Sequence, residues 1–193
     1  MAILKIARMG HPVLQQKAED VGDPSAPEIQ RLINDMNETL DDVGGIGLAA
    51  PQVHERHRVV IYYEPGRTDE EDAKELTVLI NPIIEPLEDE AEVGWESCLS
   101  LPGLTGAVPR YTHIRYTGLT PEGDAFEREA HGFHARVLQH ECDHLDGVLY
   151  PMRMSNMAYF GFTEEMRGRG APARGEGPDG DDDGEQEDEG EEQ

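Results

Sequence analysis

The chain contains 193 residues with a formal net charge of −25 at pH 7, and 37% of its residues are hydrophobic. This length is enough for one substantial core, and the acidity argues against direct binding to nucleic acid, whose phosphates attract basic proteins. The first residues do not form a cleavable signal peptide, and no apolar run approaches the length of a transmembrane helix. We therefore expect a cytoplasmic protein without membrane association.

Acidic charge is concentrated at the end of the chain. Residues 171–193 contain eleven acidic residues and one basic residue, Arg174, so they hold −10 of the total charge. From residue 168 onward there is no large apolar residue. Such a segment cannot bury enough apolar surface to fold. We expect one domain at residues 1–167, followed by a disordered acidic tail at 168–193 that keeps the protein soluble or contacts a partner.

Hydrophobic periodicity predicts the elements in chain order. Apolar residues at helical spacing predict a helix over residues 27–43. Short strand-like runs follow at residues 58–63, 76–84, 112–119 and about 125–130. The acidic stretch at residues 64–75, between the first two strands, is expected to be a surface loop.

Residues 132–146 predict a second long helix, because this segment contains no proline and Gly147 follows as a stop signal. Ser155 is expected to cap a final helix that ends near Gly168 and carries Tyr159, Phe160, Phe162 and Met166. A run of strands followed by a helix indicates an α+β fold. We expect antiparallel or mixed sheets that wrap around the helix at 132–146.

Within that helix, residues 140–144 have the sequence His-Glu-Cys-Asp-His, which is the H-E-x-x-H motif. His140 and His144 lie four residues apart, so they project from the same side of the helix. Glu141 lies beside them and can reach a water on an ion that they hold. Cys142 lies on roughly the opposite side, so we expect a buried structural thiol there. The motif favours a metal-dependent hydrolase.

A catalytic site of this kind needs a third protein ligand. Downstream of the motif the chain has no histidine or cysteine, and the thiol of Cys98 is the softest ligand upstream. Two alternatives stay open. An HExxH metallopeptidase would use Glu164 or Glu165 instead, and a structural metal module would close the site with a fourth ligand, His134 or His131.

Residues 45–52 have the glycine-rich sequence Gly-Ile-Gly-Leu-Ala-Ala-Pro-Gln. Gly45, Gly47 and Ala50 imitate a dinucleotide-binding fingerprint, which normally follows a strand and opens a helix. Here the segment follows the helix predicted at 27–43, and Pro51 blocks a second one. A glycine turn that ends a helix and leads into a strand explains the segment better.

Together, residues 45–52, Glu-Ser-Cys-Leu-Ser at 96–100 and His-Glu-Cys-Asp-His-Leu-Asp-Gly at 140–147 resemble the three signature segments of peptide deformylases, in order and separation. The resemblance extends from Arg8 to about Met152, which is nearly all of the chain except the tail. One variation is Ser97, which stands before the cysteine where glycine is frequent in the family.

The resemblance implies roles for individual residues. Cys98, His140 and His144 match the metal ligands, and Glu141 matches the catalytic acid/base. The resemblance also implies that the side chain of Gln52 and the backbone N–H of Leu99 donate to the oxyanion. The family points to Fe(II) as the ion, and a Cys-His-His set also suits Zn(II), Ni(II) or Co(II).

The implied reaction removes the N-formyl group from the formyl-methionine at the start of new proteins and releases formate. A metal-bound water attacks the formyl carbonyl, with Glu141 first as base and then as acid. The partner is the nascent formylated polypeptide. Because the C-terminal end is acidic, any contact with the ribosome is expected either to be made by residues 1–167 or to be weak and transient.

The methionine side chain of such a substrate needs an apolar slot beside the ion. Phe133 and Val137 lie on the histidine face of the helix, and Ile46 is expected opposite them. Ordinary core packing is the alternative for each of the three. Gly45 and Gly47 suit a segment that pairs its backbone with an extended peptide.

Arg136 lies about 40° from His140 around the helix, so it can border the pocket. A side chain whose stem faces solvent is the expected arrangement for this arginine. The structure decides between these two positions.

Overall fold

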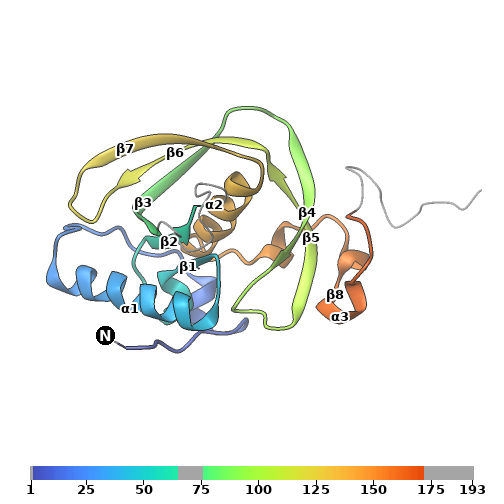
Figure 1. The fold of residues 1–193 in the computed structure, drawn as a ribbon, viewed down its shortest axis with the longest axis horizontal. Helices are drawn as coiled ribbons and strands as arrows, with labels where there is room; N and C mark the ends of the chain where they lie inside the picture. The colour runs from blue at the N-terminus through green and yellow to red at the C-terminus, as the bar shows by residue number, and fades with distance from the viewer. Residues whose placement is uncertain (1, 65–75, 172–193) are drawn as a thin grey trace, which may run out of the picture.

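The computed structural model describes residues 2–64 and 76–171 (Figure 1). Two expectations fall largely beyond these ranges. The loop expected at 64–75 lies outside the described residues except for Glu64, and the tail expected at 168–193 lies outside them except for residues 168–171. Among the described helices, none is both long and apolar enough to cross a membrane.

Within the described residues, eight strands form two antiparallel sheets. The five-stranded sheet has the order β1-β2-β3-β6-β7 and consists of β1 (Gly47–Ala49), β2 (Val59–Tyr63), β3 (Leu76–Pro86), β6 (His113–Leu119) and β7 (Ala125–His131). The three-stranded sheet has the order β4-β5-β8 and consists of β4 (Ala91–Ser97), β5 (Leu104–Tyr111) and β8 (Phe160–Phe162).

The part of the chain that the structure describes also contains three α-helices and four 3-10 turns. The α-helices are α1 (Pro27–Val43), α2 (Gly132–Leu145) and α3 (Thr163–Met166). The 3-10 turns are η1 (Pro12–Gln15), η2 (Ala50–Val53), η3 (Tyr150–Arg153) and η4 (Met157–Tyr159).

The helix α1 has the bounds that the sequence predicts. It buries its apolar stripe, and Gly44 ends it in the left-handed conformation at φ 67°, where its N–H donates to the carbonyls of Leu40 and Asp41. Glycine suits this position because it lacks the Cβ that penalises positive φ. The turn directs the chain into β1, and so the glycine segment follows a helix rather than opening one.

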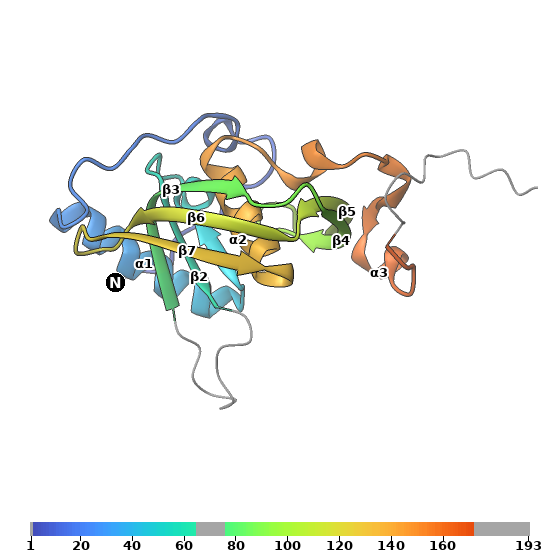
Figure 2. The same cartoon turned by 90° about the horizontal axis from the view of Figure 1, so that it is seen from above.

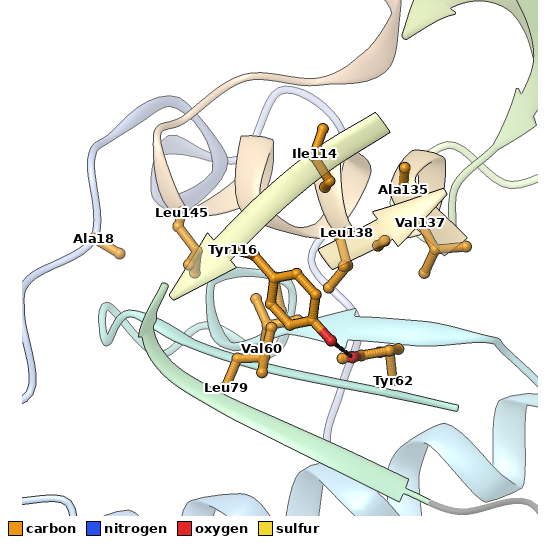
Figure 3. Packing of buried hydrophobic residues seen from close by; sticks show 12 residues of the cluster. Ala18, Val60, Tyr62, Leu79, Ile114, Tyr116, Ala135, Val137, Leu138 and Leu145 are labelled. Carbon is orange, nitrogen blue, oxygen red and sulfur yellow. Dashed lines mark hydrogen bonds between the residues drawn. The ribbon is translucent and has the colours of Figure 1, made fainter. Parts of the chain in front are cut away.

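The helix α2 is the centre of the fold. It contacts every strand of the five-stranded sheet as well as β5 of the other sheet, and Figure 2 shows it enclosed by β6 and β7 on one side. In Figure 3, Leu138 and Leu145 point from α2 toward Val60, Leu79 and Tyr116 on three strands. The prediction of an α+β fold with sheets wrapped around this helix is confirmed.

Three features differ from the predictions. The β4–β5 hairpin was not predicted, because Gly94, Gly106 and Pro109 weaken the strand signal that local composition carries. The final helix expected from Ser155 is wrong: that segment forms η4, then β8, and only four residues of helix. Phe160–Phe162 pair with Leu104–Gly106 of β5, whose open edge offers hydrogen bonds that a local reading of the sequence cannot anticipate.

Candidate active site

The H-E-x-x-H motif lies on the buried α2, and Cys98 directly follows the last residue of β4. The Sγ of Cys98 lies 3.3 Å from Nε2 of His144, and one ligand atom from each of Cys98, His140 and His144 lies within 4.8 Å of the others. Sulfur and nitrogen ligands of one tetrahedral zinc-like ion lie about 3.5 Å apart. The three side chains therefore fit one divalent ion.

Glu96 orients His140. Its Oε2 accepts a hydrogen bond of 2.8 Å from Nδ1 of His140, which leaves Nε2 of the ring free to bind an ion. The carboxylate is buried and accepts two bonds from Arg110, at 2.9 and 3.0 Å. Burial alone would raise the pKa of Glu96, but the hydrogen bonds from His140 and Arg110 lower it to about 2. Glu96 is therefore an anion that holds the imidazole in place.

Arg110 extends this network to the other side of α2. Its Nη1 donates to Oδ2 of Asp143 at 2.6 Å, and Asp143 also accepts a bond of 2.7 Å from Arg153 in η3. Both Arg110 and Asp143 are buried. Buried ion pairs are costly to break because they leave an uncompensated charge. The network thus joins β4, β5, α2 and η3 behind the histidines.

Glu141 is buried beside the histidines, and its Oε2 has no hydrogen-bond partner among the described residues. Burial raises the pKa of Glu141 to about 7. Such a carboxyl group can take up and release a proton near neutral pH. Gly47 makes room for it: a Cβ at this position would lie 2.5 Å from Oε1 of Glu141. The close approach in β1 is the physical reason for glycine there.

Gln52 lies on the opposite wall, in η2. Its Oε1 accepts a bond of 2.9 Å from the backbone N–H of Ala49, which fixes the orientation of the amide. The Nε2 then points at the thiol, 3.5 Å from Sγ of Cys98 and 3.4 Å from Oγ of Ser100. The amide N–H groups of this buried side chain therefore face the same space as the three ligands.

A cavity of about 320 Å³ opens onto these groups. Its walls include every residue that the sequence assigned to substrate binding, namely Gly45, Ile46, Gly47, Phe133 and Val137, together with Gln52 and Leu99. Val137 is 8% exposed, whereas Ile46 and Phe133 are 46% and 55% exposed. Val137 therefore lies deep in the cavity, and the other two apolar side chains lie at its rim.

The other arrangements considered for the metal do not form among the described residues. Neither Glu164 nor Glu165 joins the group formed with His140, and Nε2 of His134 instead lies 3.2 Å from the hydroxyl of Tyr62. Cys142 is a free buried thiol, as expected, and burial raises its pKa.

Comparison with known proteins identifies the family. A family model described as polypeptide deformylase matches residues 3–159. A peptide deformylase 1 from Bordetella pertussis is 53% identical over 163 residues, which cover 83% of this chain and 93% of the relative. The chain belongs to the peptide deformylase family. It is therefore an enzyme, and the reaction of its family removes the N-formyl group from nascent proteins.

Solved structures of the family share the fold. Peptide deformylase from Thermotoga maritima is 34% identical, with a TM-score of 0.72, over 79% of this chain and 98% of that one. A class I type b peptide deformylase from Acinetobacter baumannii with Met-Ala-Ser bound is 33% identical, with a TM-score of 0.71, over 78% of this chain and 99% of that one.

One prediction at the deformylase site is wrong. Arg136 was expected to face solvent, yet its side chain is only 12% exposed, and its Nη1 lies 2.8 Å from both Oε1 of Glu96 and the carbonyl oxygen of Val108. Gly94 permits this approach, because a Cβ there would lie 2.8 Å from the guanidinium carbon. Arg136 therefore borders the cavity, and its guanidinium group, which lies over Gly94 of β4, pairs with the carboxylate of Glu96.

Sequence reasoning missed the functions of Glu96, Arg110 and Asp143. A signal was present, since Glu96 precedes Cys98 by two residues and Asp143 precedes His144 by one. Charged residues close in sequence to metal ligands can hold and orient those ligands. Arg110 has no such signal, because it is not close in sequence to any predicted ligand. Ser97 is exposed at the end of β4 and lines the cavity, so its side chain fits there without displacing a ligand.

Proposed function

We propose that this chain hydrolyses the N-formyl group of an N-terminal formyl-methionine and releases formate, in the cavity between α2, β4 and residues 45–52. The observation that carries the proposal is the convergence of Cys98, His140 and His144 within 4.8 Å. Beside them lies the buried Glu141, whose Oε2 has no hydrogen-bond partner among the described residues.

Cys98, His140 and His144 would hold one divalent ion. When bound, such an ion supplies Lewis-acid activation of water and of the formyl oxygen. We propose Fe(II) as the physiological ion, with Zn(II), Ni(II) and Co(II) as alternatives that the same ligands accept. Burial lowers the pKa of His144 well below its ordinary value, so this ring stays neutral and keeps a lone pair for a cation.

Glu141 moves the proton in the proposed reaction. It accepts a proton from the attacking water, whose oxygen forms a bond to the formyl carbon. The proton then passes to the departing amine as the C–N bond breaks, so one water is consumed and formate and a free amino terminus are produced. A pKa of about 7 suits both directions of this transfer. We assign stabilisation of the developing oxyanion to the amide of Gln52 and the backbone N–H of Leu99.

The substrate is proposed to bind as an extended chain beside β1. This strand is at the end of the five-stranded sheet and pairs only with β2 among the described strands. An extended peptide can add to such an edge through backbone hydrogen bonds, which the glycines Gly45 and Gly47 allow at close range. Val137 would contact the methionine side chain, and Ile46 and Phe133 would cover it from the rim. The Met-Ala-Ser bound to the Acinetobacter baumannii relative supports a peptide with an N-terminal methionine as the class of ligand.

The experiment is an assay of formate release from formyl-Met-Ala-Ser, performed without oxygen and with metal analysis of the same sample. We expect turnover by the wild-type chain with one metal per chain. Glu141→Gln should lower kcat by about 10²-fold or more while the metal stays bound. Glu164→Gln is the matched control, and it should change neither quantity.

Two outcomes would contradict the proposal. One is a wild-type rate in Glu141→Gln with the metal retained. The other is loss of metal in Glu164→Gln but not in Cys98→Ala, which would favour an HExxH metallopeptidase. A zinc enzyme would be indicated if the protein kept its metal and its rate in air, because Fe(II) and the Cys98 thiolate are sensitive to oxidation.

We propose that the enzyme acts in the cytoplasm on nascent chains as they leave the ribosome. The formal charge of −25 leaves little electrostatic attraction to ribosomal RNA. Any contact with the ribosome is therefore proposed to be weak and transient, and to be made by residues 1–167.

A further inference from the structure

A second group of metal-ligating side chains lies on the β6–β7 ladder. His113 on β6 is directly opposite His131 on β7, and Glu129 is two residues before His131 on the same strand. Because side chains alternate between the faces of a strand, all three lie on one face. One ligand atom from each lies within 4.8 Å of the others. None of the three lines the candidate active-site cavity.

The distances suit a small cation. Nε2 of His113 lies 3.1 Å from Oε2 of Glu129, and two ligands of one tetrahedral zinc ion lie about 3.3 Å apart. The rings of His113 and His131 are nearly parallel, with centroids 3.9 Å apart. Glu129 and His131 are exposed and His113 is partly buried, so an ion can reach the cluster from solvent.

A fourth residue prepares His113 for this role. Oε1 of Glu88 lies 3.0 Å from Nδ1 of His113, so this nitrogen donates to the carboxylate and Nε2 is left to face Glu129. Carboxylates that hold the second nitrogen of a metal-binding histidine fix the ring and increase its basicity. The same carboxylate–histidine pair occurs between Glu96 and His140 in the candidate active site.

We propose that His113, Glu129 and His131 form a second divalent-cation site, which takes Zn(II) or a similar borderline ion, with Glu88 as a positioning residue. Two imidazoles and one carboxylate are ligands that suit zinc, and solvent supplies the fourth position.

Competition for Glu129 limits the affinity of the site. Arg115 lies 3.5 Å from Oε1 of Glu129, which is the other oxygen of that carboxylate, and it also lies near Glu85 and Glu127. The arginine therefore has other carboxylates available when the ion binds Glu129. We expect an exchangeable surface site that is weaker than the buried one.

An ion bound at this site would also restrain the start of α2. His131 precedes the first residue of the helix, and Gly132 has a φ of 53° at this junction. An ion shared by β6 and β7 would therefore hold the start of the helix that carries the H-E-x-x-H motif. Because a ligand that binds only the folded state stabilises it, zinc should raise the Tm through this site.

The test is equilibrium dialysis of the Ni(II)-loaded enzyme against Zn(II) at slightly alkaline pH, followed by elemental analysis that counts nickel and zinc separately. The wild-type chain should retain its nickel and take up one further zinc per chain. The double variant His113→Asn/His131→Asn should lose that zinc and keep its nickel and its deformylation rate. His57→Asn is the matched control, a histidine outside the cluster that should leave zinc uptake unchanged.

Two results would overturn the proposal. In the first, the total of nickel and zinc never exceeds one per chain in the wild type, so that zinc merely replaces nickel. In the second, the double variant takes up the additional zinc as well as the wild type does. Both variants keep every acidic residue of the chain, so a difference between them reports the histidine cluster.

Glu88→Gln tests the positioning role. We expect the affinity of the second zinc to fall about tenfold, because the amide holds the ring less strongly than the carboxylate. Glu127→Gln, which removes a nearby charge without touching His113, should have a smaller effect. Equal affinities in the two variants would contradict the role of Glu88.

Discussion

At the scale of single residues, Glu96 and Gly47 show how non-ligand positions shape the site. Glu96 accepts bonds from His140, Arg110 and Arg136 at distances between 2.8 and 3.0 Å. Gly47 contributes by the absence of a side chain, since its Cβ would overlap Glu141. Both residues act on the ligands and the base through packing and orientation.

Replacement of Glu96 should weaken metal binding. Glu96→Gln keeps the size of the side chain but removes the charge that pairs with two arginines, and loss of such an outer partner lowers metal affinity by about 10- to 100-fold. The variant should also be less stable by about 3 kcal/mol, because Arg110 remains buried with less compensation. Metal content after dialysis against a chelator and urea unfolding measure the two effects. Glu92→Gln, exposed on the same strand, should match the wild type.

Gly47→Ala should reduce catalysis without removing the metal ligands. The new Cβ would lie 2.5 Å from Oε1 of Glu141, so the carboxylate must move away from its position. We expect kcat to fall by about 10²-fold, the contribution typical of a displaced acid/base. Kinetics on formyl-Met-Ala-Ser with parallel metal analysis would measure it. Gly22→Ala is the control, because nothing lies within 4 Å of a Cβ there; equal rates in the two variants would contradict the packing argument.

At the scale of elements, α2 carries both apolar and charged side chains, and both kinds are buried. Leu138 and Leu145 are fully buried against the five-stranded sheet, while His144, Glu141 and Asp143 are also buried on the same helix. Apolar packing holds the helix in place, and the salt-bridge network compensates the charges. The apolar side chains and the charged side chains therefore lie on different faces of the helix.

Leu138→Ala should therefore destabilise the fold. This side chain has no exposed surface, so its truncation leaves a cavity that costs about 3 kcal/mol. Urea denaturation of the metal-bound protein would measure the change. Phe133→Ala, five residues earlier on α2 and 55% exposed, should change the stability by less than about 1 kcal/mol. Equal losses in the two variants would mean that the stability of α2 does not depend on this contact.

At the scale of the whole molecule, the region that matches the family model ends before the acidic end of the chain begins. The family model covers residues 3–159, and the described residues place all three signature segments on one cavity. Residues 172–193 contain Arg174 and eleven acidic residues, so they carry −10 of the total charge of −25. Nothing in the proposed reaction uses them.

Removal of residues 172–193 should leave deformylation intact. We expect kcat/KM and Tm to equal those of the full chain, because every residue proposed to act lies before residue 145. Co-sedimentation with ribosomes at physiological salt should not decrease either, since the removed segment carries the same sign of charge as RNA. A loss of ribosome binding on truncation would show that the acidic segment mediates this contact.

The sequence by itself determined the two long helices, α1 and α2, and the chemistry carried by local spacing. The bounds of α1, the expectation of a buried Cys142 and the placement of His140, Glu141 and His144 all depend on a period of 3.6 residues, which is a local property. The three signature segments added Cys98, Gln52 and Leu99 through their resemblance to the family. All of these residues except His144 line the cavity, and His144 lies 3.3 Å from Cys98.

Only the tertiary structure decided which charges support that chemistry. Glu96 and His140 are 44 residues apart in the chain, and Arg110 reaches both Glu96 and Asp143 from a strand that local composition conceals. The contacts of Arg136, the pairing of β8 with β5 and the cluster at His113 likewise join segments that are distant in the chain. Strand pairing and the burial of charge depend on contacts between distant segments, and their energies arise only when the chain is folded.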